Sequence, residues 1–158
     1  MARDPIDATK WLEIEHDKLR KAMGEIDETT DRAVKTREKL FEEFRIALKI
    51  HEAIEEEILH SLLRDQPKTK EIVLEGYEEH HAADVLVGEL DDLPVDDEMW
   101  APKFTVIKEN VEHHLEEEEE NMFPKARRVL DKDQLLALGR RMSDAAEELR
   151  AGVRAASS

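Results

Sequence analysis

Apolar residues recur along the chain at alternating steps of three and four, which is the spacing of one face of an amphipathic helix. Four long stretches follow this pattern, and each places a histidine among its apolar positions. The four faces are Leu12, His16, Leu19, Met23 and Ile26; Phe41, Phe44, Leu48, His51, Glu55, Ile58 and Leu62; Val73, Gly76, His80, Ala83, Val87 and Leu90; and Phe104, Ile107, Val111, His114, Glu118 and Met122. Runs of β-branched residues with a period of two are absent. The pattern predicts an all-α protein.

Prolines and turn residues divide these stretches. The breaks lie at Asp4-Pro5, 27–31, 65–67, 93–97 and Phe123-Pro124. Asp4-Pro5 has the form of an N-cap and first helical residue, Asp96 or Asp97 is placed to cap the fourth helix, and Pro124 is expected to end or kink it. A fifth, shorter helix is expected at about 131–150, with one apolar face formed by Leu135, Leu138, Met142, Ala145 and Leu149.

These elements fit an up-and-down four-helix bundle with an additional short C-terminal helix. A length of 158 residues suits one domain, covering 1–158, with the bundle at about 5–127. No segment rich in Gly, Pro or Ser divides the chain.

Composition excludes several classes of function. The net charge of −16 argues against nucleic acid or an anionic membrane as a partner. The absence of cysteine excludes disulfides, thiolate metal ligands and thiol catalysis. No apolar stretch resembles a signal peptide or a membrane span, so the expected location is the cytoplasm. Protein partners cannot be inferred.

The four histidines His16, His51, His80 and His114 are expected to form one layer across the bundle. In an up-and-down bundle, residues at one height are equidistant from the turn that joins their helices. Asp65-Gln66-Pro67 lies halfway between His51 and His80, and Asp97 lies halfway between His80 and His114. The midpoint of His16 and His51 falls a few residues beyond the expected first turn.

Glu55 and Glu118 each follow one of these histidines by four residues, one helical turn away on the same face. A buried carboxylate without a partner is costly, so two of them beside imidazoles indicate a shared cation. Nitrogen and oxygen ligands without sulfur suit iron, manganese or zinc. Four histidines and two glutamates are enough for two ions, with glutamate bridging the pair. The predicted metal ligands are His16, His51, Glu55, His80, His114 and Glu118.

The ordered set His16, His51-x-x-x-Glu55, His80 and His114-x-x-x-Glu118-Glu119, with Met122-Phe123-Pro124 after it, resembles the hemerythrin-like, His-His-Glu cation-binding proteins. The resemblance covers roughly residues 8–125. It implies a four-helix bundle that holds two non-haem iron ions with an oxo or hydroxo bridge, and the two glutamates as bridging ligands. It also implies that O₂, NO or peroxide binds or reacts there, with catalase- or peroxidase-like turnover as one possibility.

Two positions depart from the oxygen-carrying members of that family. A fifth histidine one turn after the third-helix ligand is replaced by Asp84, which argues against a reversible oxygen carrier and favours peroxide chemistry or plain metal binding. The usual proline after the metal segment of the second helix is missing, and His60-Ser61 occupies that region. Tyr77 and Asp84 remain open as further contacts, and His81 replaces His80 if the register of the third helix slips by one residue.

Two alternatives use the same helices. A ferritin-like site needs Glu-x-x-His on two helices, and that pattern occurs at Glu13/His16, Glu57/His60 and Glu78/His81. Glu57 and His60 are expected to miss the inward face of their helix, which disfavours this site. The other alternative is a metal-free acidic interaction module, in which the buried polar residues only fix the register of the helices.

Overall fold

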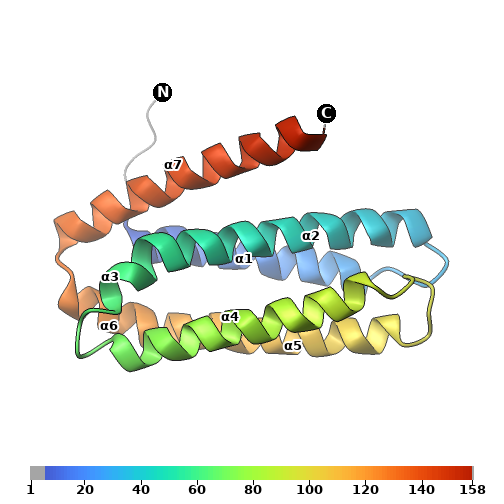
Figure 1. The fold of residues 1–158 in the computed structure, drawn as a ribbon, viewed down its shortest axis with the longest axis horizontal. Coiled ribbons are helices and arrows are strands. Elements are labelled where there is room, and N and C mark those ends of the chain that lie inside the picture. The colour runs from blue at the N-terminus through green and yellow to red at the C-terminus, as the bar shows by residue number, and fades with distance from the viewer. Residues whose placement is uncertain (1–5, 158) are drawn as a thin grey trace.

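The computed structural model describes residues 6–157, which form five continuous helical rods (Figure 1). The second and fourth rods each contain a π-helical segment, labelled η1 and η2. The elements are α1 (Ala8–Asp27), α2 (Val34–Ile54), η1 (Glu55–His60), α3 (Ser61–Leu63), α4 (Lys70–Asp91), α5 (Trp100–Glu117), η2 (Glu118–Met122), α6 (Phe123–Val129) and α7 (Lys132–Ser157).

The predicted all-α architecture is confirmed. The first four rods run alternately up and down, with α1 against α2 and α4 against α5. The fifth rod, α7, crosses the outside of this bundle and packs on α1, α2 and η1 (Figure 1). No helix within residues 6–157 has the length and apolarity needed to cross a membrane.

Polar side chains define several helix ends. The predicted cap at Asp4-Pro5 lies outside the described residues. Asp7 caps α1, because its Oδ1 accepts a hydrogen bond from the backbone N–H of Lys10 at 3.0 Å. At the start of α7, Asp131 and Gln134 exchange side-chain to backbone hydrogen bonds of 2.8 and 2.9 Å. This is the reciprocal arrangement of a capping box.

The C-terminal helix differs in two respects from its prediction. It extends to Ser157 instead of ending near residue 150. Leu149, expected on its buried face, is 40% exposed, and Ala146 is buried instead. The buried face is therefore rotated slightly from the predicted one, because α7 approaches α1 and α2 obliquely across the bundle (Figure 1).

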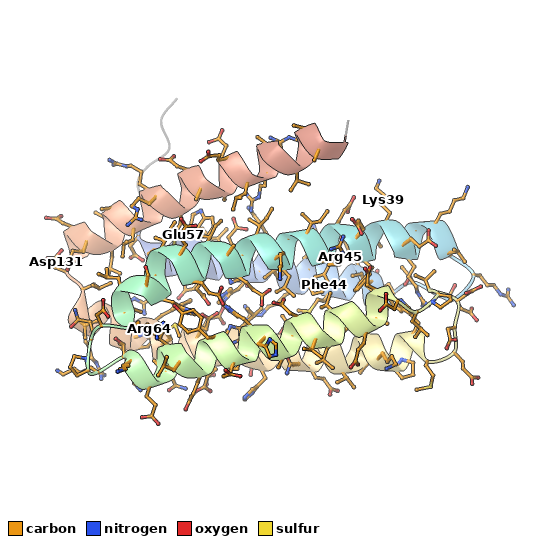
Figure 2. The ribbon with its side chains drawn as sticks, viewed as in Figure 1. Lys39, Phe44, Arg45, Glu57, Arg64 and Asp131 are labelled. Atoms are coloured by element: carbon orange, nitrogen blue, oxygen red, sulfur yellow. The ribbon has the colours of Figure 1, made fainter. Side chains whose placement is uncertain are left out.

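The apolar core consists of two clusters, with a polar layer between them along the bundle. Figure 2 shows Phe44 directed into the interior from α2, while Lys39 on the same helix points outward. One cluster includes Leu12, Ile58, Leu63 and Phe123, and the other includes Leu19, Phe44, Trp100 and Phe104. His16 lies between Leu12 and Leu19 on α1, so the boundary of the two clusters coincides with the predicted histidine layer.

The segment η1 changes the face that the second rod buries. Leu62 was predicted in the core but is 36% exposed, whereas Leu59 and Leu63 are fully buried. A π-helical turn bonds residue i to i+5 and so adds one residue to the turn, which shifts every later residue on the helix face. An unbroken α-helical period cannot continue through such a turn.

Pro124 does not end the fourth rod. The helix continues as α6 to Val129, with Pro124 in the first turn of α6 and η2 immediately before it. A proline within a regular α-helix removes one hydrogen bond and clashes with the carbonyl four residues earlier. The π-helical turn relieves this conflict by changing the hydrogen-bond register at that point.

Arg37 connects the α1–α2 and α4–α5 turns at one end of the bundle through hydrogen bonds. Its side chain is buried and donates hydrogen bonds to Thr29 Oγ1, to the backbone oxygen of Thr29 and to the backbone oxygen of Val95, at 2.9, 2.9 and 2.7 Å. The guanidinium also lies 4.6 Å from the centre of the Trp100 ring. One side chain on α2 therefore joins the α1–α2 turn to the α4–α5 turn.

We expect Arg37→Ala to lower the free energy of unfolding by about 2–4 kcal/mol, because it leaves buried carbonyl groups without a donor. Urea denaturation followed by circular dichroism measures this change. Arg32→Ala, in the exposed α1–α2 turn, is the matched control and should change stability by less than about 0.5 kcal/mol. Equal effects of the two substitutions would contradict the structural role of Arg37.

Candidate metal centre

The structure brings the six predicted ligands together inside the bundle. His16 comes from α1, His51 and Glu55 from the second rod, His80 from α4, and His114 and Glu118 from the fourth rod; all six are buried. Two Nε2 atoms, those of His16 and His114, each lie 3.3 Å from Glu118 Oε1. His80 Nε2 lies 3.1 Å from Glu55 Oε1, and His51 Nε2 lies 3.8 Å from Glu55 Oε2.

The potential metal ligands fall into two groups that share one residue. His16, His51, Glu55 and Glu118 form the first group, and Glu55, His60 and His80 form the second. Within each group, one ligand atom per residue lies within 4.8 Å of all the others. His114 lies between the groups, with its Nε2 3.1 Å from His80 Nε2 and 3.3 Å from Glu118 Oε1.

Many buried polar atoms in this layer have no hydrogen-bond partner within residues 6–157. These atoms include Nε2 of His16, His51 and His60 and both carboxylate oxygens of Glu55 and Glu118. Folded proteins leave few buried polar groups unpaired, so a cluster of them requires an explanation. Converging imidazole nitrogens and carboxylate oxygens fit shared metal ions.

Carboxylates on the outer side of the layer contact the Nδ1 atoms of three of the imidazoles. Nδ1 of His16 pairs with Glu119 Oε2 at 2.8 Å, Nδ1 of His80 pairs with Glu56 Oε1 at 3.0 Å, and Nδ1 of His114 pairs with Glu79. A carboxylate on Nδ1 fixes the ring orientation and leaves the Nε2 lone pair directed at the centre, as in many metal sites.

Arg20 in turn fixes one of these carboxylates. Its guanidinium donates to both oxygens of Glu119, at 2.9 and 2.8 Å, and to Glu112 at 2.8 Å. The pairing with Glu119 is bidentate, which restricts the position of the carboxylate more than a single hydrogen bond does. The orientation of His16 therefore depends on a chain of contacts that reaches the protein surface.

The charges of the layer depend on one another. Burial, together with the neighbouring imidazoles and against the opposing effect of Glu55, lowers the pKa of His51 to about 3. For His80 burial also acts to lower the pKa, but the neighbouring Glu55 carboxylate outweighs it and raises the value to about 9. Burial acts to raise the pKa of Glu55, yet Glu118 and the imidazoles of His60 and His80 hold it well below its usual value. Glu55 is therefore kept ionised by hydrogen bonds and by the imidazoles that surround it.

His60 is the buried residue of the layer that the helical periodicity misses. It is fully buried, and its Nε2 lies 3.2 Å from Glu55 Oε1. Its position five residues after Glu55 is off the inward face of a regular helix, so only knowledge of η1 places it correctly. Leu59 and Leu63 repeat the four-residue step of Ile58 and Leu62, so spacing does not decide which pair is buried, and only the structure shows that it is Leu59 and Leu63.

Asp84, Tyr77 and His81, whose contact with the metal the sequence left open, lie outside both groups of potential ligands. Asp84 is partly exposed, and Lys49 Nζ donates to its Oδ2 at 3.1 Å. Tyr77 packs edge-on against the ring of His60, with 5.2 Å between ring centres. His81 is exposed, so the register that places His80 inward is the observed one.

The ferritin-like alternative does not match the burial pattern. Glu78 and His81 are both exposed, so that Glu-x-x-His pair has no buried ligand, and Glu57 of the second pair is exposed as well. The expectation that His60 misses the inward face was wrong, because η1 turns it inward. The exposed Glu57 nevertheless leaves that pair without its carboxylate in the core.

A small cavity adjoins the histidine layer. It measures about 10 Å³, which is room for one water-sized molecule. Its wall contains His51, His80 and His114, with Leu48, Ala83 and Val111 among the apolar residues. Glu52 also lines it, and both oxygens of that carboxyl are buried without a hydrogen-bond partner in the described part of the chain.

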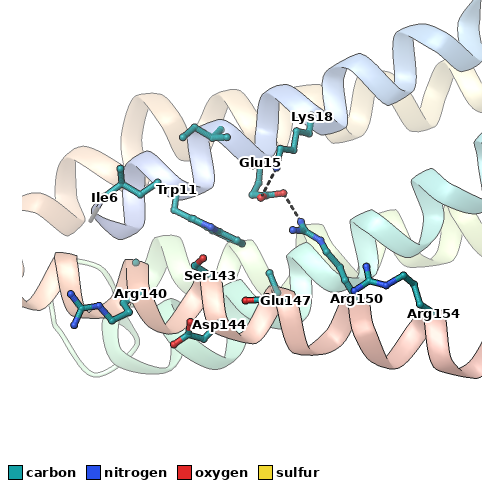
Figure 3. Close-up of a pocket in the computed structure, with 13 residues that line it drawn as sticks. Ile6, Trp11, Glu15, Lys18, Arg140, Ser143, Asp144, Glu147, Arg150 and Arg154 are labelled. Carbon is teal, nitrogen blue, oxygen red and sulfur yellow. Dashed lines mark hydrogen bonds and ion pairs between the residues drawn. The ribbon is translucent and has the colours of Figure 1, made fainter. Parts of the chain in front are cut away.

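A much larger groove lies elsewhere, between α1 and α7. It has a volume of about 1000 Å³ and contains none of the histidines (Figure 3). Glu15 crosses it, paired with Lys18 at 3.3 Å and with Arg150 at 2.9 Å. The Glu15–Arg150 pair joins α1 to α7 across this groove, and none of the potential metal ligands lines it.

The comparisons with known proteins agree with this geometry. Residues 7–126 match the family described as Hemerythrin HHE cation binding domain. The chain belongs to this family. A solved structure of a Hemerythrin HHE cation binding domain-containing protein from Mycobacterium kansasii superimposes with a TM-score of 0.84 at 24% sequence identity, over 93% of this chain and 89% of that chain. A comparison with curated proteins found no match.

Family membership makes this chain a metal-binding helical protein, and the His/Glu groups are the residues that could hold the metal. The family match covers the four rods of the bundle, and α7 follows it in the chain. At 24% identity the resemblance to the Mycobacterium kansasii protein concerns the fold.

Glu52 offers a test of the electrostatics of this hemerythrin-like layer. Burial raises the pKa of its carboxyl to about 8. We expect Glu52→Met to raise the free energy of unfolding of the metal-free protein by about 1–3 kcal/mol near pH 8, because the folded state then buries no unpaired carboxyl. The gain should shrink as the pH falls toward 4.5, where the unfolded carboxyl is also protonated.

Urea denaturation at several pH values measures this gain after chelation. Glu43→Met, at an exposed position of α2, is the control and should be neutral at every pH. A pH-independent difference between Glu52→Met and the unmodified chain would show that the carboxyl does not titrate as its burial requires.

Proposed function

We propose that this protein binds a pair of non-haem iron ions through His16, His51, Glu55, His80, His114 and Glu118. The observation that carries the proposal is the sharing of Glu55 between two groups of potential ligands. Glu118 extends toward both, with its Oε1 3.3 Å from His16 Nε2 and its Oε2 4.0 Å from His60 Nε2. Two carboxylates between two sets of imidazoles suit two ions better than one.

The donor set is compatible with iron, and family membership favours it. Imidazole and carboxylate ligands suit iron, manganese and zinc, and sulfur ligands are excluded by the absence of cysteine. Membership in the Hemerythrin HHE cation binding domain family favours iron among these metals. A bound cation would also give the buried oxygen atoms of Glu55 and Glu118 the partner that they lack within the described residues.

The proposed partner is a small molecule such as O₂, NO or peroxide. The cavity beside His51, His80 and His114 has room for about one water-sized molecule and marks where a small ligand would approach the centre. The iron pair, when bound, supplies the redox chemistry. The chain contributes the nitrogen and oxygen ligands, the carboxylates that orient the imidazoles, and apolar walls from Leu48, Ala83 and Val111 that keep bulk water away.

Elemental analysis of the purified protein tests the metal content. We expect two irons per chain in the unmodified protein and fewer than one in Glu55→Gln, because that substitution weakens both groups at once. Glu57→Gln, which changes an exposed glutamate two residues away, should keep both irons. Zinc in place of iron, or no metal in the unmodified protein, would contradict the proposal. Full iron content in Glu55→Gln would contradict only the role of that residue.

The same samples distinguish binding from turnover. If the centre consumes peroxide, the loss of peroxide absorbance should exceed that caused by an equal concentration of free iron and should disappear in Glu55→Gln. A reversible change of the visible spectrum on adding O₂, without oxidation of the iron, would instead identify a carrier.

A further inference from the structure

The segment η1 places a fifth imidazole in the layer. In an α-helix, the residue five positions after Glu55 would lie about 140° around the helix axis from it. The i to i+5 bonding of a π-helix brings that residue back over the same face. His60, the last residue of η1, is accordingly 0% exposed, as is Glu55, its first.

The ring of His60 is directed at the centre of the layer. Its Nε2 lies 3.2 Å from Glu55 Oε1 and 4.0 Å from Glu118 Oε2. It stacks on the ring of His80 with 5.6 Å between ring centres and 18° between planes, so the two imidazoles present similar edges to Glu55. Neither nitrogen of His60 has a hydrogen-bond partner within the described residues. An imidazole that served only packing would not need a position beside two carboxylates.

The facing helix leaves space for this ring. Gly76 lies on α4, one turn before His80, and a Cβ added to it would lie 3.1 Å from His60 Cε1 and 3.6 Å from His60 Nε2. Its φ angle is not positive, so position 76 does not require the wider range of backbone conformations that glycine allows. Glycine within a helix is less stable than alanine, and the close approach of His60 accounts for its presence.

We infer that His60 is a seventh metal ligand, which binds the second ion together with Glu55 and His80. This inference rests on the proposed two-ion function. The third helix carries Asp84 where oxygen-carrying relatives place a fifth histidine, and Asp84 pairs with the surface residue Lys49. In this chain the second helix supplies the fifth imidazole, through η1 and the space above Gly76. The centre then has five imidazole ligands, so the aspartate at position 84 does not reduce their number below that of the oxygen-carrying relatives.

Titration of the metal-free protein with Co²⁺ tests the assignment, because the visible absorption of Co²⁺ reports its ligands and coordination. We expect the unmodified chain to bind two Co²⁺ ions. His60→Gln should bind the first with unchanged affinity and the second at least about tenfold more weakly, with an altered spectrum of the second ion. His81→Gln removes an exposed histidine from α4 and should match the unmodified chain.

Retention of the first ion shows that His60→Gln remains folded. Binding of both ions by His60→Gln with unchanged affinity and spectrum would overturn the inference. Failure of the unmodified chain to bind two ions would instead overturn the proposed two-ion function.

A pair of glycine substitutions tests the same inference without removing any ligand. Gly76→Ala places a Cβ against the His60 ring, so it should weaken binding of the second Co²⁺ while leaving the first unchanged. Gly88→Ala, on the same helix, meets no atom within 4 Å and should leave both ions unaffected. Equal affinity for the second ion in the two variants would show that the space above Gly76 does not position a ligand.

Discussion

The burial of two carboxylates between two apolar clusters is the constraint on which the rest of the structure depends. Glu55 and Glu118 are withdrawn from water almost completely, and the desolvation of a carboxylate is offset only by positive charge or several hydrogen bonds at close range. The imidazoles of four rods provide that environment only if all four place them at one height. The polar layer therefore fixes the register of the helices, while the apolar clusters on either side contribute most of the burial.

Residues outside the histidine layer also fix the orientation of its imidazoles. Glu119, Glu56 and Glu79 each pair with an Nδ1 atom, and Arg20 holds Glu119 in a bidentate contact. These outer residues are ordinary members of an acidic surface in sequence, yet in the structure they decide which imidazole nitrogen faces the centre. Part of the large negative charge of the chain thus has a local role, since three of the imidazoles, those of His16, His80 and His114, are oriented by a carboxylate on Nδ1.

Much of the fold follows from periodicity, because apolar residues at steps of three and four specify a buried helix face wherever the helix is regular. The positions of His16, His51, His80 and His114 at one height follow from the turns between them. Periodicity fails where the helix itself changes: Leu62 was expected inside and is exposed, and His60 was expected outside and is buried. One added residue in a turn leaves no mark in composition or spacing, and it becomes visible only through the packing partner, Gly76, on another helix.

The two π-helical segments begin at the two glutamates predicted as metal ligands: η1 starts at Glu55 and η2 at Glu118. A π-helical turn is unfavourable in isolation and persists where surrounding structure or function requires it. Before the glutamate, the α-helical period points the histidine inward on both rods. After it, the second rod buries Leu59 and Leu63 and exposes Leu62, whereas the fourth rod buries Phe123 together with Met122 and Ala126, which keep the four-residue step from Glu118. A regular helix could carry the His-x-x-x-Glu pair alone, but only the shifted register lets the second rod add His60 to the same layer while Leu63 still joins the apolar cluster beneath it.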